Sequence, residues 1–198
     1  MTNTQSLEHS VYELEEDRSH EQFFFIPETV ESLANLAEGK VACLCTPTVA
    51  EKLVEKGKEE ITLFDIDTRI SSLWRSNNTL VPYDLKRGLH SSHKLNTQEL
   101  TSTHEYSYDT IIFDPPFSLV TPEEIARNVN ALLKFDLIGD TYAYIIYPAS
   151  GGEALEEAFE SLGFVGQERE DIVIKYQIPP KVVNDARKKI TCFQFRRV

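Results

Sequence analysis

The most unusual chemical pattern in this sequence is Asp114-Pro115-Pro116-Phe117, which joins a carboxylate to an aromatic ring through two prolines. Each proline fixes its own φ, so the backbone between these two side chains is stiff. The Asp114 carboxylate and the Pro115 carbonyl can both accept hydrogen bonds from an NH2 group. That would orient the nitrogen lone pair and offset the positive charge that develops as nitrogen attacks an electrophile. Phe117 could stack on a planar base or pack against a cationic chain. The pattern indicates a primary-amine site; a simple strand-ending turn is the alternative.

Two further acids, Asp65 and Asp84, stand where predicted strands end. In an open parallel sheet the carboxyl ends of the strands lie along one edge, where ligands bind. Asp65 follows Thr46 by about 20 residues, the usual spacing for an acid that accepts hydrogen bonds from ribose hydroxyls. Asp84 could then accept from an adenine amine. Aspartate is also a common turn former, but three such acids in register favour a ligand that contains a nucleoside.

The turn after the first predicted strand, Cys45-Thr46-Pro47-Thr48, lacks glycine, and no G-x-G-x-x-G occurs in the chain. This counts against a dinucleotide, because its pyrophosphate needs a glycine-rich turn. A small, hydroxyl-bearing turn could still admit a ligand without phosphates.

The elements that must position these residues alternate between strand and helix. This order is typical of an α/β fold with a mostly parallel sheet and helices on both faces, closed by a terminal antiparallel hairpin. We predict strands at 41–46, 61–64, 79–84, 108–113, 142–147, 164–176 and 190–197. We predict helices at 30–37, 47–57, 70–74, 122–133 and 152–162.

Three regions fall outside this alternation. Residues 1–20 are polar and acidic and are expected to form a mobile tail or a marginal helix before a single domain at 21–198. The aromatic cluster Phe23–Phe25 favours core packing or a lid over the sheet. Residues 85–107 form the longest stretch without predicted structure, and its histidines lack metal-ligand spacing, so no metal site is expected.

The composition limits location and partners. No apolar run approaches the roughly 20 residues of a membrane span, the first residues do not resemble a signal peptide, and three cysteines give no disulfide framework. We therefore expect a cytoplasmic protein with no membrane contact. A net charge of −12 removes the overall attraction to nucleic acid. A basic cluster near the C-terminus leaves open either a local basic face or a solvated edge: Lys181, Arg187, Lys188, Lys189, Arg196 and Arg197.

The Asp114–Phe117 motif resembles the (Asp/Asn)-Pro-Pro-aromatic motif of class I S-adenosylmethionine-dependent amino-methyltransferases. More narrowly, residues 22–198 resemble the probable N6-adenine methyltransferase family, which includes the lysine methyltransferases of elongation factor 1A. Five further segments carry the resemblance: Gln22-Phe23-Phe24-Phe25, Thr46-Pro47-Thr48, Asp65-Ile66-Asp67-Thr68-Arg69, Tyr83-Asp84 and Cys192-Phe193.

This resemblance implies a Rossmann-like, seven-stranded methyltransferase sheet with an antiparallel last strand and S-adenosylmethionine as cofactor. It implies that Asp65, with Asp67 as the fallback, holds the ribose and that Asp84 meets the adenine amine. The Thr46–Thr48 turn, with Pro47 at its centre, would lie beside the methionine part. Phe24 and Phe25 are further cofactor-binding candidates, and the catalytic candidates are Asp114, Pro115, Pro116 and Phe117.

We expect methyl transfer to a primary amine, with a basic, lysine-bearing protein as the leading substrate. Adenine N6 in DNA or RNA is the alternative, and it would need a basic surface or a partner subunit. A catalytically silent binding module is the second alternative. The intact Asp114–Phe117 motif argues against that module, because nothing structural requires these residues.

Overall fold

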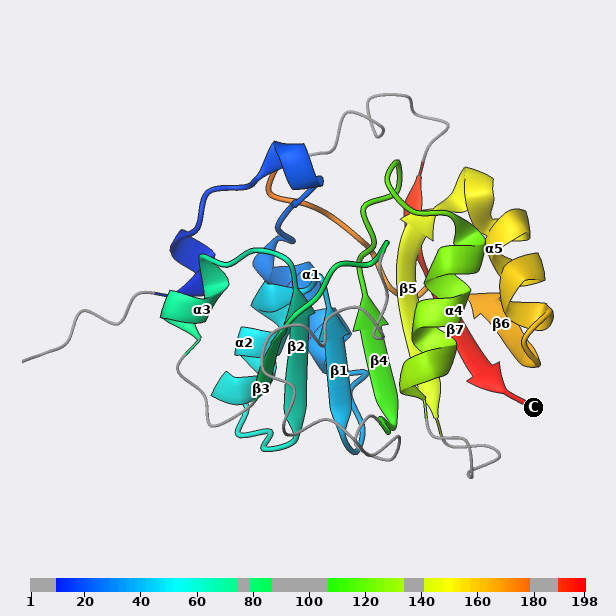
Figure 1. Ribbon diagram of the computed structural model, residues 1–198, viewed down its shortest axis with the longest axis horizontal. Coiled ribbons are helices and arrows are strands. Elements are labelled where there is room, and N and C mark those ends of the chain that lie inside the picture. The colour runs from blue at the N-terminus through cyan, green and yellow to red at the C-terminus, as the bar shows by residue number, and fades with distance from the viewer. Residues whose placement is uncertain (1–9, 75–78, 87–106, 134–140, 179–188) are drawn as a thin grey trace, which may run out of the picture.

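A seven-stranded sheet forms the centre of the protein in a computed structural model that describes residues 10–74, 79–86, 107–133, 141–178 and 189–198 (Figure 1). The strand order is β3-β2-β1-β4-β5-β7-β6. The strands are β1 (Val41–Leu44), β2 (Ile61–Asp65), β3 (Thr79–Pro82), β4 (Thr110–Phe113), β5 (Tyr142–Pro148), β6 (Phe164–Glu168) and β7 (Ile190–Arg197). The first five are parallel, whereas β7 is antiparallel to both β5 and β6. The predicted fold class, including the antiparallel last strand, is confirmed.

Helices cover both faces of this sheet, as the alternation predicts. Figure 1 shows α1 (Pro27–Ala34) and α2 (Pro47–Glu55) behind the sheet and α4 (Pro122–Leu132) and α5 (Gly152–Glu160) in front of it. The short α3 (Ile70–Leu73) follows β2, and its Ile70 joins the core on the α1–α2 side. Successive residues of a strand point to opposite faces. Leu44 and Phe113 therefore pack toward α4 and α5, while Cys43 and Ile112 pack toward α1 and α2.

Two helices begin at the predicted residues, Pro47 and Pro122, but are capped differently. At α4, the Thr121 hydroxyl accepts from the Glu124 backbone N–H, and the Glu124 carboxylate accepts from the Thr121 N–H. This capping box confirms the predicted start. At α2, Thr46 occupies the N-cap position, but its hydroxyl donates to the Ile112 carbonyl (3.3 Å) instead of capping the helix. Its side chain thus ties the turn after β1 to β4.

The predicted strand at 164–176 is too long. β6 ends at Glu168, and the following segment, Arg169–Gln177, leaves the sheet and returns to the aromatic cluster. Tyr176 forms an antiparallel bridge with Phe25. The Ile26 N–H donates to the Lys175 carbonyl (3.0 Å), and the Gln177 N–H donates to the Phe24 carbonyl (2.7 Å). We call Arg169–Gln177 the return segment.

Residues 10–20 pack against the domain in short helical turns, which are closer to the predicted marginal helix than to the predicted mobile tail. They contain two 3-10 turns, Val11–Glu13 and Arg18–His20, and the Val11 side chain is 1% exposed. The Ser10 hydroxyl donates to the Glu51 carboxylate on α2 (2.8 Å). Burial of Val11 explains the difference, because a buried apolar anchor offsets the entropy of ordering a short segment. The boundary at residue 21 stays a prediction, and residues 1–9 lie outside the described ranges.

Other predictions also fall outside the described ranges: residues 87–106 with their histidines, and Lys181, Arg187 and Lys188 of the basic cluster. Within the described part of the chain, no helix has the length and apolar character to cross a membrane.

Candidate functional site

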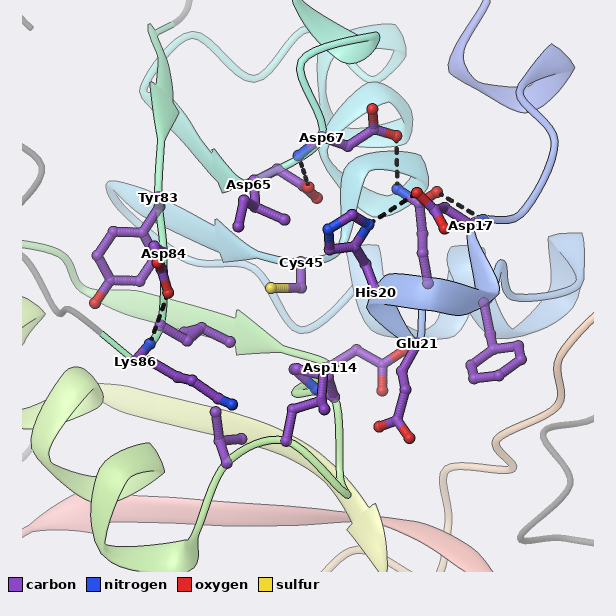
Figure 2. Close-up of a pocket in the computed structure, with 17 residues that line it drawn as sticks. Asp17, His20, Glu21, Cys45, Asp65, Asp67, Tyr83, Asp84, Lys86 and Asp114 are labelled. Carbon is purple, nitrogen blue, oxygen red and sulfur yellow. Dashed lines mark hydrogen bonds and ion pairs between the residues drawn. The ribbon is translucent and has the colours of Figure 1, made fainter.

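A cleft of about 270 Å³ opens at the carboxyl ends of the parallel strands. Its walls come from the ends of β1, β2, β3 and β4 and from the N-terminal residues 17–23, and Figure 2 shows the labelled side chains converging on it. The polar and charged lining residues are Asp17, His20, Glu21, Gln22, Cys45, Asp65, Asp67, Tyr83, Asp84, Lys86 and Asp114. The apolar ones are Phe23, Ile66, Leu85, Pro116, Leu119 and Val120.

Asp65 is the last residue of β2 and is only 6% exposed. One of its carboxylate oxygens accepts from the Asp67 backbone N–H (2.9 Å), and no cation forms an ion pair with it in the described residues. Burial raises the pKa of Asp65 to about 7. Asp65 therefore offers a desolvated acceptor whose charge depends on pH near neutrality.

The neighbouring Asp67 is already occupied by protein partners. Arg69 donates to its carboxylate from Nε and Nη2 (2.9 and 2.8 Å), and the Gln22 amide donates from the N-terminal segment (3.1 Å). Burial alone would raise the pKa of Asp67, but the hydrogen bonds from Arg69 and Gln22 bring it below its ordinary value. The structure thus gives Asp67 a role in fixing the N-terminal segment to the β2 loop.

Asp84 reaches the cleft two residues beyond β3 and accepts from the Lys86 backbone N–H (3.0 Å). The chain around it is held by a buried pair, in which the Tyr83 hydroxyl donates to the Asn128 side chain of α4. The Asn128 amide in turn donates to the Leu85 carbonyl (3.3 Å). These contacts tie the β3 loop to α4 and so fix the position of Asp84.

Asp114 directly follows β4, and its backbone N–H donates to the Leu44 carbonyl of β1 (3.2 Å). Its carboxylate accepts a hydrogen bond from the Tyr176 hydroxyl (2.8 Å). Burial raises the pKa of Asp114 well above its usual range, and the Tyr176 hydrogen bond partly offsets that rise. Such a carboxylate is a stronger base than a solvated one.

The remaining members of the predicted motif are arranged differently. Pro116 lines the cleft, while Pro115 and Phe117 are not among its lining residues. The Phe117 ring packs edge-on against Tyr147 with ring centres 5.9 Å apart. In this arrangement Phe117 supports the loop from outside the cleft.

The other cofactor-binding candidates are also buried outside the lining. Phe24 and Phe25 are each 2% exposed. Thr46 and Thr48 are each 1% exposed, and Pro47 between them is buried. Cys45 is the residue of that turn that reaches the cleft. The structure therefore brings together Asp65, Asp67, Asp84, Asp114 and Pro116 at the cleft, and the roles of all the candidate residues stay predictions.

Sequence reasoning missed the N-terminal wall. The His20 ring bonds to Asp17 (2.8 Å) and faces the Asp65 side of the cleft (Figure 2). The Glu21 carboxylate accepts from the Ser118 backbone N–H (3.0 Å) and from the Ser118 hydroxyl, which joins this wall to the loop after Asp114. The available signal was the adjacent Gln22-Phe23-Phe24-Phe25 segment, since residues 17–21 carry no distinctive pattern of their own.

Two lining residues also adopt left-handed backbone conformations without being glycine: Glu21 (φ 54°) and Cys45 (φ 53°). Such residues cost on the order of 1 kcal/mol or more and concentrate at functional sites. Cys45 lies between Asp65 and Asp114, and burial followed by these two carboxylates raises the pKa of its thiol well above the usual range. Its thiol is therefore protonated and uncharged.

The cleft is lined by more acidic than basic side chains. Six acidic residues line it together with Lys86 and His20, although Arg69 pairs with Asp67 and burial raises the pKa of Asp65 and Asp114. Opposite charge stabilises a ligand in a low-dielectric cleft. The site therefore favours a cationic ligand that also carries hydrogen-bond donors.

Comparison with known proteins identifies the family. The family described as "Probable N6-adenine methyltransferase" matches residues 16–193. The chain belongs to this family. It is similar to the EEF1A lysine methyltransferase 1 of Bos taurus, with 29% identity over 129 residues, which cover 61% of this chain and 51% of that protein. The chain spans about half the length of the curated relatives it matches.

Solved structures of methyltransferases share the fold of this family member. A candidate RNA methyltransferase from Pyrococcus horikoshii superposes with a TM-score of 0.60 and 14% identity, covering 94% of each chain. The magnesium protoporphyrin IX methyltransferase of Synechocystis, solved with bound SAM, gives a TM-score of 0.53 and 14% identity. It covers 86% of this chain and 78% of that one. The likeness extends over nearly the whole chain.

Proposed function

We propose that this protein is an S-adenosylmethionine-dependent N-methyltransferase that modifies a primary amine, with a protein lysine as its substrate. The observation that carries the proposal is the convergence of Asp65, Asp84 and Asp114 on one acidic cleft at the carboxyl ends of adjacent strands. Membership of a methyltransferase family supports the reaction class.

The cleft has the donor and acceptor chemistry that the cofactor needs. Asp65 would accept from the ribose hydroxyls, and we prefer it to Asp67 because Arg69 and Gln22 already occupy Asp67. Asp84 would accept from the adenine amine, and the turn of Cys45 and Thr46–Thr48 would lie beside the methionine part. When bound, S-adenosylmethionine supplies an electrophilic methyl group on a positively charged sulfur. The six carboxylates favour that charge.

Asp114 would act on the incoming amine. Its carboxylate and the Pro115 carbonyl would accept hydrogen bonds from the nitrogen and point its lone pair at the methyl carbon. The nitrogen gains positive charge as the carbon–nitrogen bond forms, and the Asp114 charge stabilises it. A lysine arrives as an ammonium and must lose one proton to solvent before the attack, so that the Asp114 carboxylate is still ionised when positive charge develops on the nitrogen.

The placement of charge favours a basic protein over nucleic acid. Arg196 lies opposite Tyr142 at the start of β5, so the end of β7 is at the edge of the sheet away from the cleft. Arg197 there bonds to Asn130 (3.1 Å). Lys189 lies at the other end of β7, beside the carboxyl end of β5, and pairs with Glu168 (3.2 Å). Phosphate recognition depends on cations next to the site, and among the described residues the cleft offers Lys86 and His20 against six carboxylates. The lysine methyltransferases of elongation factor 1A among its relatives support the same substrate class.

Adenine N6 is the second candidate, and the description of the family favours it. The amine chemistry at Asp114 would be the same, with Phe117 turned from Tyr147 to stack on the base. This reaction would need a basic partner subunit to hold the nucleic acid. We place either reaction in the cytoplasm, which fits three free thiols and no disulfide in the described residues.

Transfer of a radiolabelled methyl group to separate protein, RNA and DNA fractions tests the proposal. We expect label in a protein fraction, on lysine. Asp114→Ala should lower transfer at least about 1000-fold while S-adenosylhomocysteine affinity stays within a few-fold, and Glu153→Ala on the exposed side of α5 is the matched control. Absence of label in all fractions together with no cofactor binding would overturn the proposal, and unchanged turnover in Asp114→Ala would remove Asp114 from its role.

A further inference from the structure

Tyr176 of the return segment contacts the proposed catalytic carboxylate from behind the cleft. Its hydroxyl donates to Oδ1 of Asp114 (2.8 Å), while its side chain is only 8% exposed and does not line the cleft. The two residues are 62 positions apart in sequence. The hydrogen bond thus joins a segment outside the sheet to the first residue of the Asp114–Phe117 motif.

The position of the Tyr176 ring is tightly determined. Its ring centre is 4.9 Å from that of Phe25 and 6.1 Å from that of Phe23. The backbone on both sides of it is paired with the aromatic cluster through Ile26 and Phe24. In addition, the Thr29 hydroxyl on α1 donates to the Val173 carbonyl (3.1 Å) and accepts from the Lys175 N–H (3.0 Å). A phenol held in this way can fix the orientation of the carboxylate that it contacts.

We propose that Tyr176 is a positioning residue that keeps the Asp114 carboxylate ionised and turned toward the amine. This inference rests on the proposed function. By holding Oδ1, the hydroxyl leaves the second oxygen of Asp114 to accept from the substrate nitrogen. A hydrogen bond to the charged form of a carboxylate favours that form, and it acts here against the burial that favours the neutral acid.

Other charged groups around Asp114 do not supply this stabilisation. Cys45 faces it from the turn after β1 as an uncharged thiol, and Glu21 and Asp65 add negative charge from the N-terminal wall and from β2. The Lys86 side chain extends into the cleft from the loop after β3 (Figure 2), and no ion pair joins it to Asp114 among the described residues. Among the described ion pairs none includes Asp114, so the phenol is the donor that the described structure places on its carboxylate.

Tyr176→Phe tests the proposal, because it removes the hydroxyl and keeps the ring against Phe25. We expect the turnover number to fall about 10-fold to 100-fold, as for loss of a charge-assisted hydrogen bond, with the KM for the methyl donor within about twofold. The activity requires ionised Asp114 and is lost as pH falls through its pKa. Loss of the hydroxyl raises that pKa, so the acidic limb of the pH profile should move to higher pH.

A second readout does not depend on activity. In protein labelled with 13C at aspartate carboxyls, with Asp114→Asn to assign the signal, Asp114 should titrate at higher pH in Tyr176→Phe than in the wild type. Tyr144→Phe is the matched control and should leave the Asp114 titration unchanged. It also removes a hydroxyl from a largely buried tyrosine, but this tyrosine is on β5. An unchanged Asp114 titration in Tyr176→Phe would overturn the positioning role, even if the enzyme is active.

The reciprocal variant keeps the proposal testable if Tyr176→Phe fails to fold. Asp114 raises the pKa of the Tyr176 phenol, after burial as the larger cause. In Asp114→Asn, a tyrosine should therefore ionise at lower pH, seen as phenolate absorbance near 295 nm. No such change would contradict the contact. Failure of the wild type to transfer methyl to any substrate, with these titrations as expected, would overturn the proposed function and leave the Asp114–Tyr176 coupling intact.

Discussion

If Asp65 binds the ribose as proposed, its raised pKa makes cofactor binding depend on pH. A carboxylate can accept from two ribose hydroxyls only when it is ionised, since a protonated acid gives up one acceptor position to its own O–H. With the pKa of Asp65 raised by burial to about 7, the ionised fraction is about one tenth at pH 6 and one hundredth at pH 5. The apparent dissociation constant rises by the inverse of that fraction. Binding should therefore weaken about 10-fold at pH 6 and about 100-fold at pH 5, and should level off above pH 8.

Isothermal titration calorimetry with S-adenosylhomocysteine between pH 5 and 9 measures this dependence. Asp65→Asn should bind more weakly at pH 8, by about 10-fold to 100-fold for the lost charge, and should lose the pH dependence. Asp114→Asn should keep it, which separates the two buried acids, and His20→Gln is the control for the imidazole that faces Asp65. Wild-type affinity that stays within twofold between pH 5 and 8 would refute the assignment of Asp65 to the ribose.

Three further predictions concern the elements around the cleft. First, ionised Asp65 is stabilised less in the folded than in the unfolded chain, so its contribution to stability is largest at low pH and is lost as pH rises through about 7. Thermal unfolding at pH 8 should therefore show Asp65→Asn to be more stable than the ligand-free wild type. The gain is at most about 4 kcal/mol, because each unit by which folding raises the pKa of Asp65 costs about 1.4 kcal/mol. A variant less stable than the wild type would contradict this prediction. Second, Ser118→Ala removes one of the two hydrogen bonds that Glu21 accepts from Ser118. Stopped-flow measurements should then show S-adenosylhomocysteine dissociating about 3-fold to 10-fold faster. An unchanged dissociation rate would mean that the Ser118 hydroxyl does not help to hold the N-terminal wall in place. Third, Val11→Ala should lower the unfolding free energy by about 1–3 kcal/mol in denaturant titrations, because Val11 is 1% exposed. An unchanged unfolding free energy would mean that Val11 does not anchor residues 10–20 to the domain.

The local parts of the fold followed from sequence because they depend on neighbouring residues. The capping box at Thr121 needs only Glu124 three positions later. The strand that ends at Phe113 is fixed by the prolines after it, which cannot donate to a sheet. The site acids Asp65, Asp84 and Asp114 were found because strand ends in a parallel sheet meet at one edge.

The parts that sequence reasoning missed depend on distant partners. Ile172, Ile174 and Tyr176 alternate as a strand does, and nothing local shows that this segment leaves β6 and that Tyr176 pairs with Phe25. Val11 is one apolar side chain in an acidic stretch, too few to give a period. The contact of Tyr176 with Asp114 follows from that same return path, so the residue that we infer to position the Asp114 carboxylate had no signal in the sequence.

The surplus of carboxylates in the cleft also bears on how a catalytic cycle would end. In the proposed reaction the methyl donor enters as a sulfonium cation, and the nucleoside left behind after transfer has a neutral thioether. The six carboxylates that line the cleft attract the first through a charge that the second no longer carries. The thioether product would thus bind the cleft more weakly than the sulfonium methyl donor. The same carboxylates that attract the donor would therefore favour its exchange for the product after each transfer.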